Sequence, residues 1–200
     1  MISLSGIVNL LETAQFYLYN LDQQTTSVED HRAYGALFLV FGGLLIAEAL
    51  SGGVWQRSLL RTLLLPATLI PIGAGVVTVS LVQPSPPLIH VGLGALLLAG
   101  GLIEVRSRLR QLPRLAADPV AVPALLAAGI LIGPVHYEGT IASPVAVVHW
   151  LIAGTIVAMA LVRLGQHFRP ASAPLMASFG GLVVILAVAF LLVPGGPHHA

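Results

Sequence analysis

Long apolar segments separated by short polar stretches dominate the pattern of hydrophobic and polar positions along this chain. A helix needs about 20 apolar residues to cross the roughly 30 Å hydrocarbon core of a bilayer, and six segments approach that length. These segments are 33–50, 59–82, 87–105, 120–136, 144–164 and 174–193. The pattern therefore predicts an all-α, polytopic membrane protein of about six transmembrane helices.

The composition agrees with this fold class and excludes others. Hydrophobic residues make up 56% of the chain and charged residues only 8%, which excludes a water-soluble domain. The absence of cysteine rules out disulfides and thiolate metal sites. A formal net charge of +1 argues against a nucleic acid as a partner, so the expected partners are the lipid bilayer and other membrane subunits.

The arginines predict how the chain is oriented in the membrane. All of them except Arg32 flank the loops after the first, third and fifth segments. The positive-inside rule puts those loops in the cytoplasm and both termini outside. Because Arg is the only strongly basic residue used, as in GC-rich bacterial genomes, we expect a multi-pass protein of the bacterial inner membrane.

The ends of the chain are expected to lie outside the bundle. Residues 1–30 start with an apolar stretch that is interrupted by Asn9, Glu12 and Gln15, and no basic region precedes it. This stretch is unlike a cleavable signal peptide and is typical of a helix lying in the membrane interface, on the extracytoplasmic side. The transmembrane domain then covers 31–194, and 195–200 form a tail.

The transmembrane domain contains an internal repeat. His31, His90 and His149 follow one another at the same interval of 59 residues, and each opens an odd-numbered segment. Each repeat holds two spans, which divides the domain into three helical hairpins at about 31–89, 90–148 and 149–194. All three histidines then enter from the outer face, which His136 also reaches. A small residue follows each repeated histidine after four positions: Gly35, Gly94 and Ala153.

An imidazole with a small residue one helical turn away has a known use. The missing side chain leaves a flat slot where a porphyrin can pack while a ring nitrogen ligates the iron. The alternative is that the small residues let helices approach closely, while the histidines contact water or lipid headgroups.

The same histidines suit other metals. Imidazole binds copper and zinc, so His31, His90 and His149 form a candidate metal site, to which Asp30 and Glu138 could add oxygen ligands. No two of these residues have the close spacing of a metal motif on one helix, so such a site would have to be assembled across helices.

Acidic residues also occur at the cytoplasmic ends of the odd-numbered segments. Glu48 and Glu104 end the first and third segments, and Arg163 takes the corresponding place in the fifth. We expect an ion pair between Glu104 and Arg163 or extension of these side chains to the interface. A proton pathway through Glu48 is the alternative.

The first and third segments resemble the heme A synthase family of cytochrome b-type membrane bundles. The resemblance rests on His31–Arg32 with Glu29 upstream and on His90 leading GLGALLLAGGL, and with His149 it covers roughly 29–165. It implies a heme-binding helical bundle with these three histidines as candidate axial ligands. The sequence departs from the family in lacking an outer cysteine pair, a large outer loop and a fourth helix-opening histidine, so the synthase activity itself is not expected. His90 and GALLLAGGL are also similar to the membrane domain of copper-resistance permeases.

These observations predict a heme b-binding subunit of a bacterial electron-transfer complex, respiratory or photosynthetic. Its ligands would be two of His31, His90, His136 and His149. A copper-handling membrane protein and a cofactor-free structural subunit are the alternatives. No nucleophile elbow, phosphate loop or dinucleotide fingerprint occurs, so independent enzymatic activity is not expected. The repeat leaves open whether the three hairpins form a ring or a row.

Overall fold

The computed structural model describes residues 27–52, 54–82, 88–109, 114–132, 144–170 and 172–193, and these are almost entirely helical. The expected interfacial segment, His136 and the tail lie outside the described residues. The helices are α2 (Ser27–Leu50), the short 3₁₀ helix η1 (Trp55–Arg57), α3 (Leu59–Val82), α4 (Leu88–Arg108), α5 (Arg114–Ile130), α6 (Pro144–Phe168) and α7 (Ala173–Leu191).

The helices confirm the predicted all-α membrane architecture. Five of them, α2, α3, α4, α6 and α7, are long and apolar enough to cross a membrane. The helix in the place of the fourth expected span is shorter, because the apolar part of α5 covers only Ala121–Ile130. Pro66 and Pro71 lie inside α3, which continues through both, as membrane helices tolerate.

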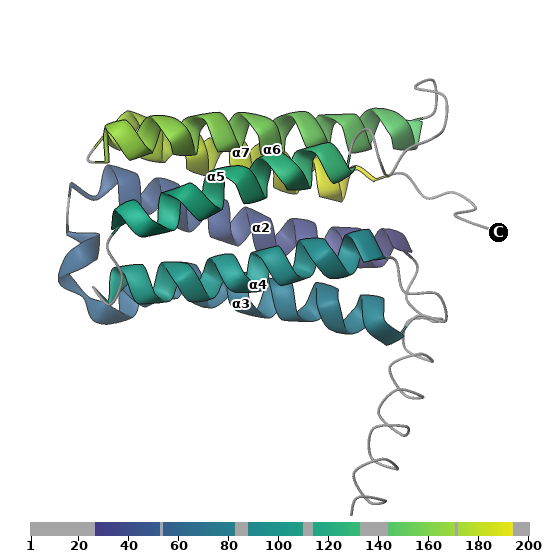
Figure 1. Ribbon diagram of the computed structural model, residues 1–200, viewed down its shortest axis with the longest axis horizontal. Coiled ribbons are helices and arrows are strands. Elements are labelled where there is room, and N and C mark those ends of the chain that lie inside the picture. Colours follow the sequence, from purple (N-terminus) through teal and green to yellow (C-terminus); the bar gives the residue numbers. More distant parts are fainter. Residues whose placement is uncertain are drawn as a thin grey trace, which may run out of the picture.

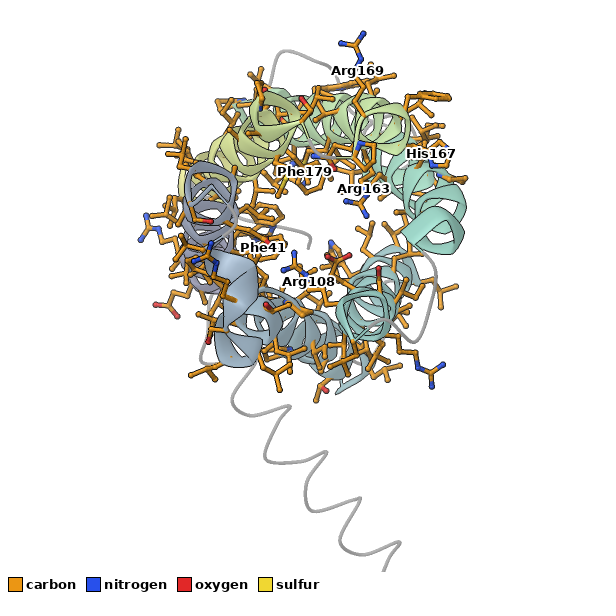
Figure 2. The ribbon with its side chains drawn as sticks, turned by 90° about the vertical axis from the view of Figure 1, so that its left-hand side faces the viewer. Phe41, Arg108, Arg163, His167, Arg169 and Phe179 are labelled. Atoms are coloured by element: carbon orange, nitrogen blue, oxygen red, sulfur yellow. The ribbon has the colours of Figure 1, made fainter. Side chains whose placement is uncertain are left out.

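The six long helices form a closed ring around a central axis. Figure 1 shows them running side by side, with successive helices in opposite directions. The view along the bundle in Figure 2 shows the ring, in which α7, the last helix, lies against α2, the first described one. The structure therefore answers the question that the repeat left open, in favour of the ring.

The two ends of the ring carry different side chains. The starts of α2, α4 and α6 lie at one end, which carries His31, His90 and His149 and is called the histidine end. The opposite end carries Arg108 and Arg163 and is called the arginine end.

The closest helix pairs are not the expected hairpins. The most extensive contacts join α2 with α7, α3 with α4, and α5 with α6. Within the three hairpins, α6 packs well against α7, but α2 touches α3 sparsely and α4 touches α5 sparsely. The ring is therefore made of three tight pairs, and two of the three seams between the pairs are loose.

Small residues explain why the tight pairs are tight. A Cβ atom on Gly94 of α4 would lie 2.8 Å from the backbone nitrogen of Val77 on α3, and one on Gly42 of α2 would lie 3.0 Å from the carbonyl oxygen of Gly180 on α7. Backbones approach this closely only where side chains are missing, which is the usual device for joining membrane helices.

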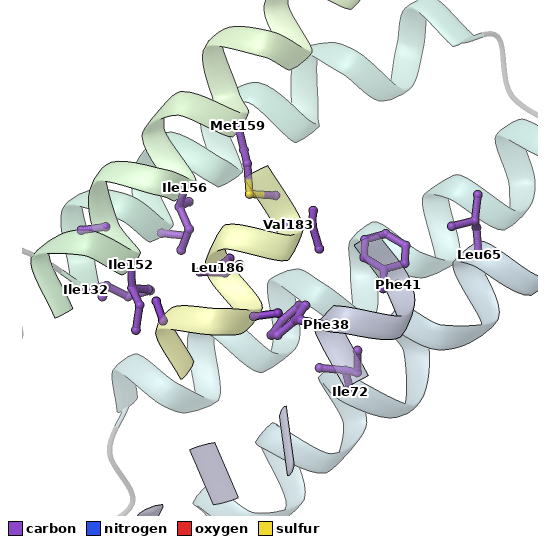
Figure 3. Packing of buried hydrophobic residues seen from close by; sticks show 14 residues of the cluster. Phe38, Phe41, Leu65, Ile72, Ile132, Ile152, Ile156, Met159, Val183 and Leu186 are labelled. Carbon is purple, nitrogen blue, oxygen red and sulfur yellow. The ribbon is translucent and has the colours of Figure 1, made fainter. Parts of the chain in front are cut away.

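Apolar side chains from several helices point toward the inside of the ring. Figure 3 shows Phe38 and Phe41 of α2 near Leu65 and Ile72 of α3, with Met159 and Val183 across from them. All of these side chains are buried, at 7% exposure or less. The outer wall carries exposed Leu and Val side chains instead, such as Val40 and Leu161, as expected of a surface that faces lipid.

Candidate functional site in the central cavity

The axis of the ring contains a cavity of about 800 Å³, lined by side chains from all six long helices. Water fills polar spaces readily, whereas apolar cavities stay dry. The walls are polar at both ends and apolar between them, so this cavity suits a molecule that is largely apolar.

The internal repeat lines the cavity layer by layer. Each of α2, α4 and α6 has six residues at corresponding positions that face the lumen, the first of which is the repeated histidine. They follow one another at intervals of three or four residues, which places them on one face of the helix. From the histidine end to the arginine end, the layers are His31, His90 and His149; Tyr34, Leu93 and Ile152; Phe38, Leu97 and Ile156; Phe41, Gly100 and Met159; Leu45, Glu104 and Arg163; and Glu48, Ser107 and Gln166. The 59-residue repeat thus corresponds to an approximate threefold arrangement of the lining residues.

The histidine end brings two of the predicted residues together. The ring centres of His31 on α2 and His149 on α6 are 6.4 Å apart, with an interplanar angle of 72°. Phe190 of α7 lies between these helices and stacks on His31 at 5.7 Å, and Phe38 in turn contacts Phe190 at 5.6 Å. His90 lines the same cavity from α4.

The histidine pair has a spacing that suits a shared metal centre. Two imidazoles that bind one metal from opposite sides, through nitrogen bonds of about 2 Å, have ring centres roughly 6 Å apart. Among the residues that the structure describes, no group of three or more His, Asp or Glu side chains is close enough to hold a metal ion. The three repeated histidines are therefore not gathered as a three-ligand site. A metal centre that needs only two protein ligands, as heme does, is the kind that the pair could hold.

The small residues that follow the histidines do not border the cavity. A Cβ atom on Gly35 would lie 2.9 Å from the carbonyl oxygen of Ala187, and Gly94 is closed off by α3. Ala153 is 4% exposed and lies against Gly129 of α5. The space beside all three is filled by a neighbouring helix, which agrees with the helix-packing interpretation of these residues and leaves no porphyrin slot beside them.

The arginine end holds a buried ion cluster centred on Arg108. Its Nη1 and Nη2 atoms each donate a hydrogen bond of 2.9 Å to one oxygen of Glu48, and its Nε donates one of 2.8 Å to Glu104. Nη1 also donates to the carbonyl oxygen of Thr62 at 3.2 Å. Glu48 is only 3% exposed. One guanidinium therefore joins α2, α3 and α4, next to the loose seam between α2 and α3.

Arg163 extends this cluster across the lumen. Its Nη2 lies 3.8 Å from Glu104, which confirms the predicted ion pair. Its Nη1 donates to Gln166 at 3.1 Å, and the amide nitrogen of Gln166 donates to the carbonyl oxygen of Leu175 at 3.0 Å. Figure 2 shows Arg108 and Arg163 inside the ring, whereas Arg169 points away from it. The cluster thus reaches from α2 through α4 and α6 to α7.

The sequence interpretation missed Arg108. It was grouped with the loop arginines that orient the chain, although Glu104 precedes it by four residues, a spacing that favours an ion pair on one helix face. Its main partner, Glu48, is 60 residues away on α2 and comes near only in the folded bundle.

The fold and the cavity define a class, a multi-pass membrane protein in which a ring of helices encloses a cavity with two polar ends. Within the described residues, five helices meet the length and hydropathy of a membrane span. Comparisons with known protein families, with curated proteins and with solved structures give no match.

Proposed function

We propose that the protein is a heme b-binding membrane subunit that transfers electrons within a larger complex. The observation that carries this proposal is the separation of 6.4 Å between the ring centres of His31 and His149 at one polar end of a cavity whose middle is apolar. A heme bound between these imidazoles would supply a one-electron redox couple. The resemblance of 29–165 to cytochrome b-type bundles points in the same direction.

The side chains around the pair have defined tasks in this proposal. His31 and His149 would hold the heme iron through their imidazole nitrogens. Phe190 stacks on His31 and keeps the plane of its imidazole from rotating, while Phe38 supports Phe190 from the interior. The apolar side chains of the middle layers border the site on its inner side, and an apolar surrounding raises the potential of a redox group by disfavouring its more highly charged form.

The arginines suggest where this site lies in the cell. The loops at the arginine end are the basic ones, so the positive-inside rule assigns that end to the cytoplasm and the histidine end to the outer side. We propose that the protein resides in a bacterial inner membrane, with the heme near the extracytoplasmic face. Other membrane subunits would then deliver and accept the electrons.

The proposal is tested by optical spectra of the purified full chain in a mild detergent, oxidised and dithionite-reduced, after expression with heme supply. We expect a Soret band and sharp reduced α and β bands in the wild type. His31→Ala and His149→Ala should lose most of the bound heme. His167→Ala is the matched control, because His167 lines the other end of the cavity, and it should keep the spectrum.

Three results would count against the proposal. A wild-type protein without heme bands but with stoichiometric copper would favour metal handling. Neither heme nor copper would favour a structural subunit. Loss of heme in His90→Ala together with full retention in His31→Ala would show that a different histidine pair holds the heme.

A further inference from the structure

One layer of the cavity wall lacks a side chain. In the fourth layer from the histidine end, Phe41 and Met159 project from α2 and α6, but the corresponding residue on α4 is Gly100. A Cβ atom on Gly100 would meet no heavy atom within 4 Å, whereas one on the adjacent Gly101 would lie 2.9 Å from Ile70. Gly101 therefore serves helix packing, and Gly100 leaves room in the lumen.

This gap is next to the ion cluster. Glu104 and Arg163 form the following layer, one helical turn or about 6 Å further along the axis. Of the two arginines in the cluster, Arg108 is held at 2.8–2.9 Å by both carboxylates, while Arg163 lies 3.8 Å from Glu104 and donates a hydrogen bond of 3.1 Å to Gln166. The guanidinium of Arg163 points into the lumen, so a second acid arriving from the gap would meet it first.

The gap lies on a helix that borders one of the loose seams of the ring. Gly100 is on α4, and α4 packs only sparsely against α5. The side chains around the gap are apolar on the other helices, including Phe179 and Val183 of α7. The space thus combines an apolar lining with a cationic group at one end, beside a sparsely packed seam.

We propose that the arginine half of the cavity binds a single-chain amphiphile with an acidic head, either a fatty acid or a single-chain lipid phosphate. The head pairs with Arg163, since a guanidinium binds carboxylates and phosphates through two parallel hydrogen bonds. The chain runs past Gly100 toward the middle layers. The head-binding group is distinct from the histidine end, because 14 residues, or about 21 Å of helix, separate His149 from Arg163 on α6.

The test uses radiolabelled palmitate and the delipidated full chain in a neutral maltoside detergent, with binding measured by equilibrium dialysis. We expect saturable binding of the radiolabelled palmitate. Unlabelled palmitate should displace the label, and palmityl alcohol should not. Arg163→Gln should weaken binding about tenfold through loss of the charged hydrogen bonds. Gly100→Phe should abolish it, because the new ring fills the gap beside Phe41 and Met159.

Two matched controls separate these effects from damage to the fold. Arg169→Gln removes an exposed arginine at the same end of the ring, and Gly43→Phe adds a ring at an exposed glycine outside the cavity with nothing within 4 Å. Both should bind palmitate like the wild type, and gel filtration should show all variants folded.

The outcomes decide the proposal and the source of the ligand. It is overturned if the wild type binds no palmitate saturably, if palmityl alcohol competes equally well, or if Gly43→Phe impairs binding as much as Gly100→Phe. Lysophosphatidic acid is tested as a competitor in the same assay. If it displaces palmitate, and if Arg163→Gln weakens its binding as well, the proposal is supported and a lipid phosphate is a second candidate ligand. Mass spectrometry of lipid extracted from the purified wild type then shows which source is carried. Heme spectra of the same preparations report separately on the electron-transfer proposal.

Discussion

At the scale of single residues, Arg108 makes the most contacts at the arginine end of the ring. It binds both oxygens of Glu48, one oxygen of Glu104 and a backbone carbonyl of α3. Buried ions in such a network are stable only together, since removing one partner leaves an uncompensated charge where water is scarce. Arg108 therefore matters more for the fold than its place near the end of a helix suggests.

Replacing Arg108 by Gln should destabilise the protein by about 3–5 kcal/mol, because Glu48 then stays buried without its counter-ion. Unfolding in mixed micelles with increasing SDS measures this change. Arg106→Gln, two residues away on the same helix and exposed, should leave stability nearly unchanged. Equal effects of the two substitutions would contradict the role assigned to the cluster.

The residue scale also shows how far the candidate site was predictable. The ion pair between Glu104 and Arg163 is predicted from their equivalent positions in two repeats, and the structure confirms it with a distance of 3.8 Å. His31, His90 and His149 were predicted to open helices at one end, and all three line the cavity there. That His31 approaches His149 was not predictable, because it depends on the placement of α7 and Phe190 between their helices.

At the scale of elements, glycines decide which helices pair. Gly73 on α3 and Gly94 on α4 face each other, so that a Cβ on either would contact the backbone of the other helix. The same arrangement joins α2 to α7 through Gly42 and Gly180. Where the chain offers no such contact, between α2 and α3, the packing is sparse.

Gly94→Leu should therefore destabilise the protein by about 1–3 kcal/mol or more, since the new side chain forces α3 and α4 apart. Gly92→Leu is the control on the same helix, because a Cβ there would meet nothing within 4 Å. Thermal unfolding of both variants in detergent compares them. A Gly94→Leu variant that melts at the wild-type temperature would show that the close pair is not needed.

At the scale of the whole molecule, closure of the ring by α2 and α7 creates the cavity. The rings of Phe38 and Phe190, from the first described helix and the last, have centres 5.6 Å apart. A row of hairpins would keep these helices at opposite ends and would enclose no lumen.

Chemical cross-linking checks this closure in a chain that has no cysteine of its own. Phe38→Cys combined with Phe190→Cys should be joined efficiently by a short bifunctional thiol reagent, and peptide mapping should find the link within one chain. Phe38→Cys combined with Ala127→Cys on α5 should not react, because Ala127 is exposed and α5 is not adjacent to α2 in the ring. Cross-linking of the second pair but not the first would contradict the ring.

The sequence by itself determined the membrane class, the helical spans and the 59-residue repeat, because these follow from local hydropathy and spacing along the chain. Only the tertiary structure decided what the small residues do, since Gly35 and Gly94 could equally have bordered a cofactor or a helix. It also decided the partner of Arg108 and the ring itself. Each of these depends on contacts between segments far apart in the chain. Several arrangements of equally apolar helices would bury the same surface, so hydropathy along the sequence cannot distinguish one arrangement from another.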